Sequence, residues 1–115
     1  MLEETAARLL REATAEPVRV VRAVLEGVSP GDLGPLARKI AAHPDTVAIL
    51  AAIGDRLHLC VARSEGVELD AAAVLGALCA ELGGKGGGRP AFAQGSAPSA
   101  DRAHVEAVLQ RYPQP

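Results

Sequence analysis

The residues best suited to chemistry in this chain lie in one segment, Gly83 to Gly95, which reads GGKGGGRPAFAQG. Half of the chain's 12 glycines fall in this segment, and its charged residues are two cations, Lys85 and Arg89. Glycine loses much conformational entropy when it is ordered, so a folded protein keeps such a run where positive φ angles or the close approach of another molecule require it. The segment contains no Asp or Glu. It therefore predicts a binding site for an anionic partner.

The glycine segment does not follow the pattern of a Walker-type phosphate loop. That loop reads GxxxxGK[ST] and leads into the N-terminus of a helix, whose free N–H groups receive the phosphate. Here residues 70–82 repeat apolar side chains at helical spacing, and Gly83 stands where a left-handed residue would end that helix. The glycines thus follow the negative end of a helix dipole, so Lys85, Arg89 and backbone N–H groups would have to hold an anion. This order argues against Walker-type hydrolysis.

The run GGKGGGRP followed by AQG resembles the signature of the DHH-associated domain. This domain closes the bacterial alanyl-tRNA synthetases and also occurs in DHH phosphoesterases such as RecJ-type nucleases, which carry a His-containing variant of the loop. The Lys and Arg form found here is similar to the synthetase branch, and the resemblance extends in element order from Val18 to Tyr112. The family usually has Asp-Met after the proline, whereas this chain has Ala91 and Phe92. Contacts made by that aspartate do not carry over.

The resemblance implies a tRNA-binding and association module that contacts the outer corner of alanine tRNA and aids aminoacylation and editing. Lys85 and Arg89 would bind backbone phosphates, and Gln94 would touch a base or support the loop. The glycines expected to permit close approach of the RNA are Gly83, Gly84, Gly86, Gly87 and Gly88. The resemblance also implies a homodimer. ATP, Mg²⁺ and zinc would act only in other domains of such an enzyme, so this chain is expected to hold no cofactor.

Other readings of the same residues stay open. The chain could be the substrate-binding lobe of a DHH phosphoesterase, which grips a phosphate near two metal ions in the other lobe, or a pure dimerisation domain. Phe92 could stack on an unpaired base or fill the core. Gln94 could hydrogen-bond a base edge or the backbone of its own loop. The glycines could simply form a tight return between a helix and a strand.

Composition limits the class of protein. The 115 residues suffice for one domain with its own core, and hydrophobic residues make up 49% of them while aromatic residues make up 2%. The core must therefore consist of Ala, Val, Leu and Ile. A net charge of −2 argues against a generally basic surface, so any contact with nucleic acid must be local. No apolar run reaches the roughly 18 residues of a membrane span. We expect a soluble cytoplasmic protein without a membrane partner.

Other reactive side chains give no catalytic pattern. Cys60 and Cys79 lie on separate apolar stretches without CxxC spacing, which predicts buried free thiols. His58 and Cys60 are spaced as two metal ligands could be, but no third ligand is near in sequence, so no metal site is expected. Nucleophile-elbow, DHH and paired-carboxylate motifs are absent from the sequence. We therefore expect no catalytic residue in this chain.

The hydrophobic periodicity predicts an α/β (α+β) domain with a mixed sheet of about four strands flanked by helices, in the order αβαββαβα. The strands are predicted over residues 18–25, 46–52, 56–63 and 91–96. Asp32 or Gly34 would cap the second helix and Ser99 the last one. Residues 1–16 are predicted to form a separate N-terminal helix with an apolar stripe. It is either the end of a longer helix whose stripe packs on a partner helix, or a helix that packs on its own domain. Residues 17–115 form the globular domain.

Overall fold

The computed structural model describes residues 2–13 and 18–113. Over these residues the element order is αβαββαββα. The helices are α1 (Leu2–Glu12), α2 (Pro30–Ala41), α3 (Ala71–Leu82) and α4 (Arg102–Leu109). The strands are β1 (Arg19–Glu26), β2 (Thr46–Ile53), β3 (Arg56–Arg63), β4 (Lys85–Arg89) and β5 (Phe92–Pro98).

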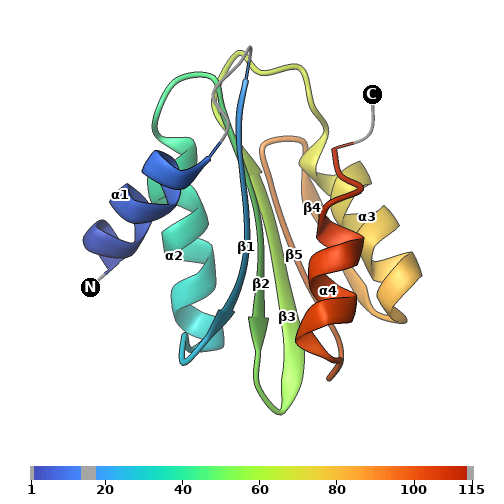
Figure 1. Ribbon diagram of the computed structural model, residues 1–115. Helices are drawn as coiled ribbons and strands as arrows, with labels where there is room; N and C mark the ends of the chain where they lie inside the picture. Colours follow the sequence, from blue (N-terminus) through green and yellow to red (C-terminus); the bar gives the residue numbers. More distant parts are fainter. Residues whose placement is uncertain (1, 14–17, 114–115) are drawn as a thin grey trace.

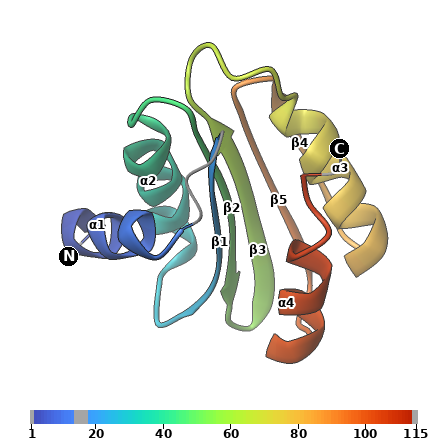
Figure 2. The ribbon, with the colours of Figure 1, turned by 45° about the horizontal axis from the view of Figure 1, so that its top comes forward.

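The sheet lies between two layers of helices, with α1 and α2 on one face and α3 and α4 on the other (Figures 1 and 2). Successive side chains of a strand point to opposite faces, so each strand contributes to two apolar clusters. One cluster joins the sheet to α3 and α4, with Ile49 and Leu75 among its fully buried members. The other joins the sheet to α1 and α2 and includes Leu36 and Leu50.

The strands run in the spatial order β1-β2-β3-β5-β4 among the described residues. β1 and β2 are parallel and α2 crosses between them, whereas β2–β3, β3–β5 and β5–β4 are antiparallel pairs. β2 is buried along its length except at Ile53, as expected for a central strand covered on both faces. The strands predicted over residues 46–52 and 56–63 are present and form the β2–β3 hairpin, and the predicted α+β class is confirmed.

The predicted sheet lacked one strand. Residues 85–89 form the edge strand β4, which pairs with β5 across the two-residue connection Pro90-Ala91. Glycine is depleted in strands because it adds no side-chain packing, so the sequence favoured a loop at this place. Pairing with β5 overrides that preference. Residues 85–89 of the glycine segment therefore form an open edge strand, and the prediction of a loop there was wrong.

The ends of the helices agree with the predicted capping residues at α3 but not at α2 and α4. The prediction that Gly83 ends α3 in a left-handed conformation is confirmed by its φ of 73°, and Asp70 caps the other end by accepting from two backbone N–H groups. α2 begins one turn earlier than predicted: Ser29 is its N-cap and Pro30 its first residue, a position that suits proline. The N-cap of α4 is Asp101 instead of Ser99.

The N-terminal helix packs on its own domain. Ala6, Leu9 and Leu10 of α1 are buried in the cluster shared with α2, and Glu3 forms an ion pair of 2.8 Å with Lys39 of α2. The predicted boundary between residues 16 and 17 lies outside the described residues and stays a prediction. Within the described ranges, no helix combines the length and the apolar character that crossing a membrane would need.

Candidate nucleic-acid interface

β4 forms an open edge of the sheet. All of its residues are exposed, and its partner β5 separates it from the rest of the sheet. α3 packs on β4 and β5 on one face, while α2 lies over β2 and β3 on the other. The face of β4 and β5 beside α2 is therefore left uncovered. We call this face the interface; alternation along the strands gives it residues 85, 87 and 89 of β4 and residues 92, 94 and 96 of β5.

The strand registers place the candidate side chains in rows across β3, β5 and β4. Lys85 lies opposite Ser96 and Arg89 lies opposite Phe92. Between these rows, Gly87 lies opposite Gln94. Gln94 in turn pairs with Cys60 of β3, which is buried in the cluster beneath α2. Alternation along the strands puts all of these positions on the α2 side of the sheet. The structure thus brings Lys85, Arg89 and Gln94 onto one surface.

The two cations of the interface have no internal counter-charge. Within the described part of the chain, neither Lys85 nor Arg89 forms an ion pair or a side-chain hydrogen bond. The carboxylate that precedes them most closely, Glu81, accepts hydrogen bonds from Tyr112 and Arg111 instead. The pKa of Glu81 is held below its usual value chiefly by the hydrogen bond from the Tyr112 hydroxyl. Glu81 is therefore an anion at neutral pH, but it pairs with Tyr112 and Arg111 at the C-terminal end of α3 and not with the cations of β4.

Most glycines of the segment are required by the fold itself, either because a side chain would clash with β5 or because the backbone has a positive φ. A Cβ on Gly84, Gly86 or Gly88 would lie 2.3 or 2.4 Å from the nearest atom of β5, so the close pairing of the two strands excludes larger residues there. Gly83 is fixed by its positive φ. At Gly87, by contrast, no atom lies within 4 Å of the place a Cβ would take. Of the glycines between residues 83 and 88, Gly87 is the one that leaves space on the interface itself.

Gln94 and Phe92 lie against α2. The Nε2 atom of Gln94 is 2.7 Å, and the Cζ atom of Phe92 3.3 Å, from where a Cβ on Gly34 would stand. Phe92 is half-buried on the α2 cluster, and the Cζ atom of Arg38 lies 4.1 Å from its ring centroid. Gln94 is exposed, and its side chain forms no hydrogen bond with the described residues.

Arg38 of α2 lies beside the interface, and the sequence did not reveal it. Nothing in the sequence shows that α2 passes over Phe92. The usable signal was its spacing from Gly34: residues one helical turn apart lie on the same helix face. A glycine and an arginine on that face would mark a close approach to the sheet, but they do not show which strand is approached.

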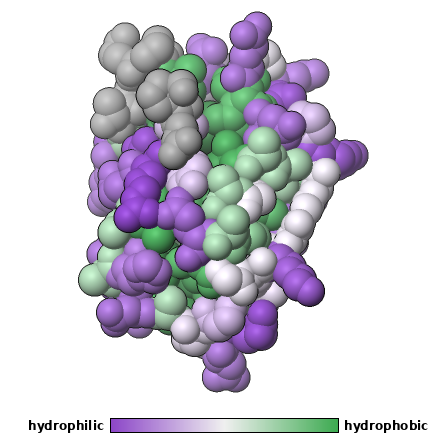
Figure 3. Space-filling view, turned by 90° about the vertical axis from the view of Figure 1, so that its right-hand side faces the viewer, coloured by the Kyte–Doolittle hydropathy of each residue, from purple (hydrophilic) through white to green (hydrophobic). Residues whose placement is uncertain are grey.

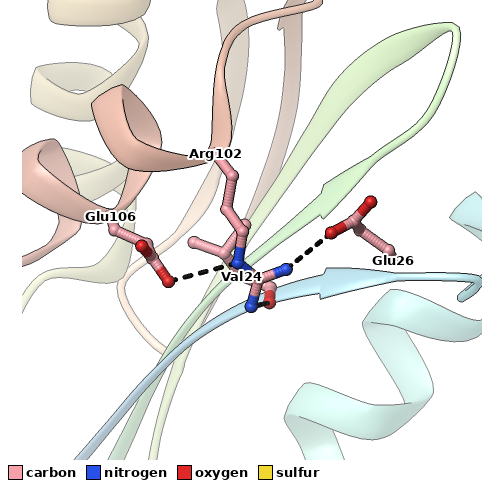
Figure 4. Close-up of polar contacts among 4 residues, drawn as sticks. All are labelled: Val24, Glu26, Arg102 and Glu106. Atoms are coloured by element: carbon pink, nitrogen blue, oxygen red, sulfur yellow. Dashed lines mark hydrogen bonds and ion pairs between the residues drawn. The ribbon is translucent and has the colours of Figure 1, made fainter.

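The arginine of α4 is used differently from the cations of the interface. Arg102 bonds Glu26 at 2.8 Å, Glu106 at 3.3 Å and the carbonyl oxygen of Val24 at 2.8 Å (Figure 4). These contacts tie α4 to the end of β1. Arg102 therefore has a structural role and no free donor face comparable to that of Lys85 or Arg89.

The cysteines are free and buried, as predicted. Burial raises the pKa of the Cys60 thiol to about 12, so it stays protonated at neutral pH. His58 is only half-buried on the same strand. Within the described residues, no group of three or more His, Cys, Asp or Glu side chains is placed to hold a metal ion.

The fold is an α+β domain with a cationic edge strand exposed beside a helix. Residues 18–112 match the DHHA1 domain family, so the chain belongs to this family. The resemblance seen in the glycine segment and in the element order is thereby confirmed.

Curated relatives of the chain are alanine–tRNA ligases. The enzyme of Psychrobacter cryohalolentis is 43% identical over 75 residues, which cover 61% of this chain and 8% of the relative. The enzyme of Psychrobacter arcticus is 37% identical over 103 residues, which cover 84% of this chain and 11% of the relative. The chain thus spans about a tenth of the length of these relatives.

Solved structures share the fold. The C-Ala domain of the Aquifex aeolicus alanyl-tRNA synthetase aligns with a TM-score of 0.69 at 24% identity, over 81% of this chain and 92% of that one. RecJ of Thermus thermophilus, in complex with Mn²⁺, aligns with a TM-score of 0.61 at 23% identity, over 99% of this chain and 17% of that one. Both proteins therefore contain this fold, and in RecJ it is a small part of a larger chain.

Proposed function

We propose that this chain is a tRNA-binding and association module of the alanyl-tRNA synthetase type. Lys85 and Arg89 contact backbone phosphates at the outer corner of the tRNA, and the module helps one tRNA reach both the aminoacylation and the editing sites. The ATP- and metal-dependent chemistry belongs to other domains of such an enzyme. The names of the relatives and the family membership support this assignment.

The observation that carries the proposal is the pair of uncompensated cations on one open face. A strand rises about 3.3 Å per residue, so residues 85 and 89 stand about 13 Å apart and reach different phosphates. No carboxylate within the described residues neutralises either of them. Because the chain as a whole carries a net charge of −2, attraction of RNA requires a local basic surface, and Lys85 and Arg89 provide one on β4.

Two phosphate contacts give only weak binding. Each contact on a single-stranded segment contributes about 0.7 to the salt slope, and the affinity is correspondingly modest. A module of this strength works when it is tethered to a stronger binder, because the second contact then becomes intramolecular and gains effective concentration. This is the situation of a domain that spans about a tenth of a much longer enzyme.

The association part of the proposal rests on α3. Its outward residues are small and apolar, and no charged side chain occurs within the helix before Glu81. Figure 3 looks at the side that carries α3 and α4, where apolar side chains gather in the middle and hydrophilic ones lie around the rim. An uncharged helix surface of this kind favours contact with another apolar surface, which supports self-association as a homodimer.

The test compares two double variants in a tRNA-binding assay at low salt. We expect Lys85→Ala with Arg89→Ala to weaken binding of alanine tRNA about tenfold, because two phosphate contacts are lost. The matched control, Arg8→Ala with Arg11→Ala, removes the same charge from exposed positions of α1 and should change affinity by less than about twofold. Equal losses in the two variants would show that net charge alone attracts the RNA and would refute the proposal.

The tRNA-binding assay, together with sedimentation and a single-stranded DNA ligand, separates the other functions. A pure dimerisation domain predicts that tRNA binding of the full-length protein is unchanged in the Lys85 and Arg89 variant, while sedimentation still shows a dimer. The substrate-binding lobe of a DHH phosphoesterase is the second candidate, favoured by the structural match to RecJ. It predicts that short single-stranded DNA binds the chain more tightly than tRNA does.

A further inference from the structure

The junction of α2 with β5 has features that phosphate binding does not use. Arg38, Phe92 and Gln94 meet there beside the two cations of β4, and Gly34 allows the close approach. We call these four residues the α2–β5 step. We infer that the step binds one unpaired nucleobase, which stacks on the guanidinium of Arg38 and hydrogen-bonds the amide of Gln94. This inference rests on the proposed function, since Lys85 and Arg89 bring the RNA to this face.

Arg38 offers a fixed planar surface. Its guanidinium carbon lies 4.1 Å from the centroid of the Phe92 ring, so the ring supports the guanidinium on one side. The residue is exposed, and in the described part of the chain it forms no ion pair. A guanidinium plane stacks on bases as it does on aromatic rings, and one that is already held loses less entropy on binding. Arg38 therefore serves as a stacking platform.

Gln94 supplies the hydrogen bonds. Its amide nitrogen lies beside Gly34 of α2, where a Cβ would stand only 2.7 Å away, yet the amide bonds no group within the described residues. An amide both donates and accepts, which suits the Watson–Crick edge of a base. A side chain that is positioned but has free hydrogen-bonding groups costs little to engage. Gln94 can therefore orient the base that Arg38 stacks.

Gly87 leaves the path to the step open. It faces Gln94 across the strand pair, and no atom lies within 4 Å of where its Cβ would be. The gap lies between Lys85 and Arg89, so a base can enter between two phosphates held by these cations. In a duplex the bases are stacked and paired, so no base face is free to stack on the guanidinium of Arg38. The class of ligand is therefore RNA with an unpaired, unstacked nucleotide.

The test measures binding of two RNAs of equal charge by NMR titration of the 115-residue chain at low salt. One is an oligoadenylate of about eight nucleotides, a length within the usual site sizes, and the other is the same backbone with abasic sugars. We expect Arg38→Ala to weaken oligoadenylate binding about tenfold, the effect of one stacked base, and abasic RNA by less than about twofold. Arg38→Lys keeps the charge but lacks the plane, so it should lose nearly as much on oligoadenylate as Arg38→Ala.

The control variant is Arg8→Ala, which removes one exposed charge from α1 and should treat both RNAs alike. The inference is overturned if Arg38→Ala weakens both RNAs equally, or if Arg38→Lys binds as the wild type does, because either result makes Arg38 a simple charge. Failure of the proposed function looks different. In that case the Lys85 and Arg89 double variant binds both RNAs as tightly as the wild type.

Discussion

The two ends of the sheet use their cations in opposite ways. At β1, Arg102 of α4 bonds Glu26, Glu106 and the carbonyl oxygen of Val24 (Figure 4). At the opposite edge, Lys85 and Arg89 of β4 are exposed and bond no other described residue through their side chains. Residue type does not distinguish the bonded cation from the free ones, since Arg102 and Arg89 are both arginines. The difference is the number of hydrogen-bond acceptors that the fold places around each side chain.

This difference indicates which cations can serve a ligand. An arginine whose guanidinium is held by three internal acceptors turns toward a phosphate only by breaking those bonds, each worth about 1 kcal/mol, or more when an acceptor is charged. A cation that bonds only water loses no internal contact when RNA binds. We therefore expect substitution of Arg102 beside β1 to lower the stability of the protein, and substitution of Lys85 or Arg89 of β4 to lower its affinity for RNA.

The largest expected effect separates two neighbouring glycines of β4. Gly86→Ala places a Cβ 2.4 Å from the Cα atom of Gly95, and the backbone must shift, so we expect a loss of about 3 kcal/mol in the free energy of unfolding. Gly87→Ala meets no atom within 4 Å and should change stability by less than about 1 kcal/mol. Urea denaturation of both variants measures the difference.

A bulkier residue at the open glycine sharpens the comparison further. Gly87→Val suits a strand and should leave the protein folded, but its side chain fills the gap between Lys85 and Arg89 and should weaken RNA binding.

The comparison of the two alanine variants has its own contradicting result. If Gly87→Ala destabilised the protein as much as Gly86→Ala does, the pairing of β4 with β5 would have to differ from the observed register.

A smaller effect distinguishes Arg102 from Lys85. We expect Arg102→Ala to lower the free energy of unfolding by about 1 kcal/mol, mainly through the lost bond to the Val24 carbonyl, because its ion pairs are largely exposed. tRNA affinity should not change. Lys85→Ala should show the reverse, with stability within about 0.5 kcal/mol of the wild type and weaker RNA binding. A loss of affinity in Arg102→Ala would remove the distinction between the two edges.

The smallest effect concerns the carboxylate that precedes β4. Because the Tyr112 hydroxyl holds the pKa of Glu81 low, Glu81 contributes stability that is fully present above its unfolded pKa of about 4.3 and is lost as pH falls through the lower folded value. Tyr112→Phe should therefore be less stable than the wild type near neutral pH, and the difference should shrink below about pH 4. Urea denaturation at both pH values checks this. A difference that does not vary with pH would mean that the bond does not stabilise the carboxylate.

The sequence was sufficient for those parts of the fold that depend on local pattern. The positions of β2 and β3 and the left-handed end of α3 at Gly83 were predicted and are confirmed. The edge strand β4 was missed because its glycines carry no strand signal. Its existence depends on pairing with β5, which is a tertiary contact.

The candidate site was predictable in its charges and less so in its geometry. Lys85 and Arg89 stand out in the sequence because few other side chains surround them. The reasons for the glycines around them were not visible, since a tight strand pair and an open gap need the same residue. Arg38 could not be found at all, because its place over Phe92 follows from how α2 crosses the sheet.

The most direct measurement is the salt dependence of tRNA affinity for the wild type, for the Lys85→Ala and Arg89→Ala double variant, and for Arg102→Ala. If Lys85 and Arg89 contact phosphates, the logarithmic slope of the double variant will be shallower than that of the wild type by about 1.4, while the slope of Arg102→Ala will match the wild type. A double variant with the slope of the wild type would contradict the account, because the RNA would then be held elsewhere on the molecule.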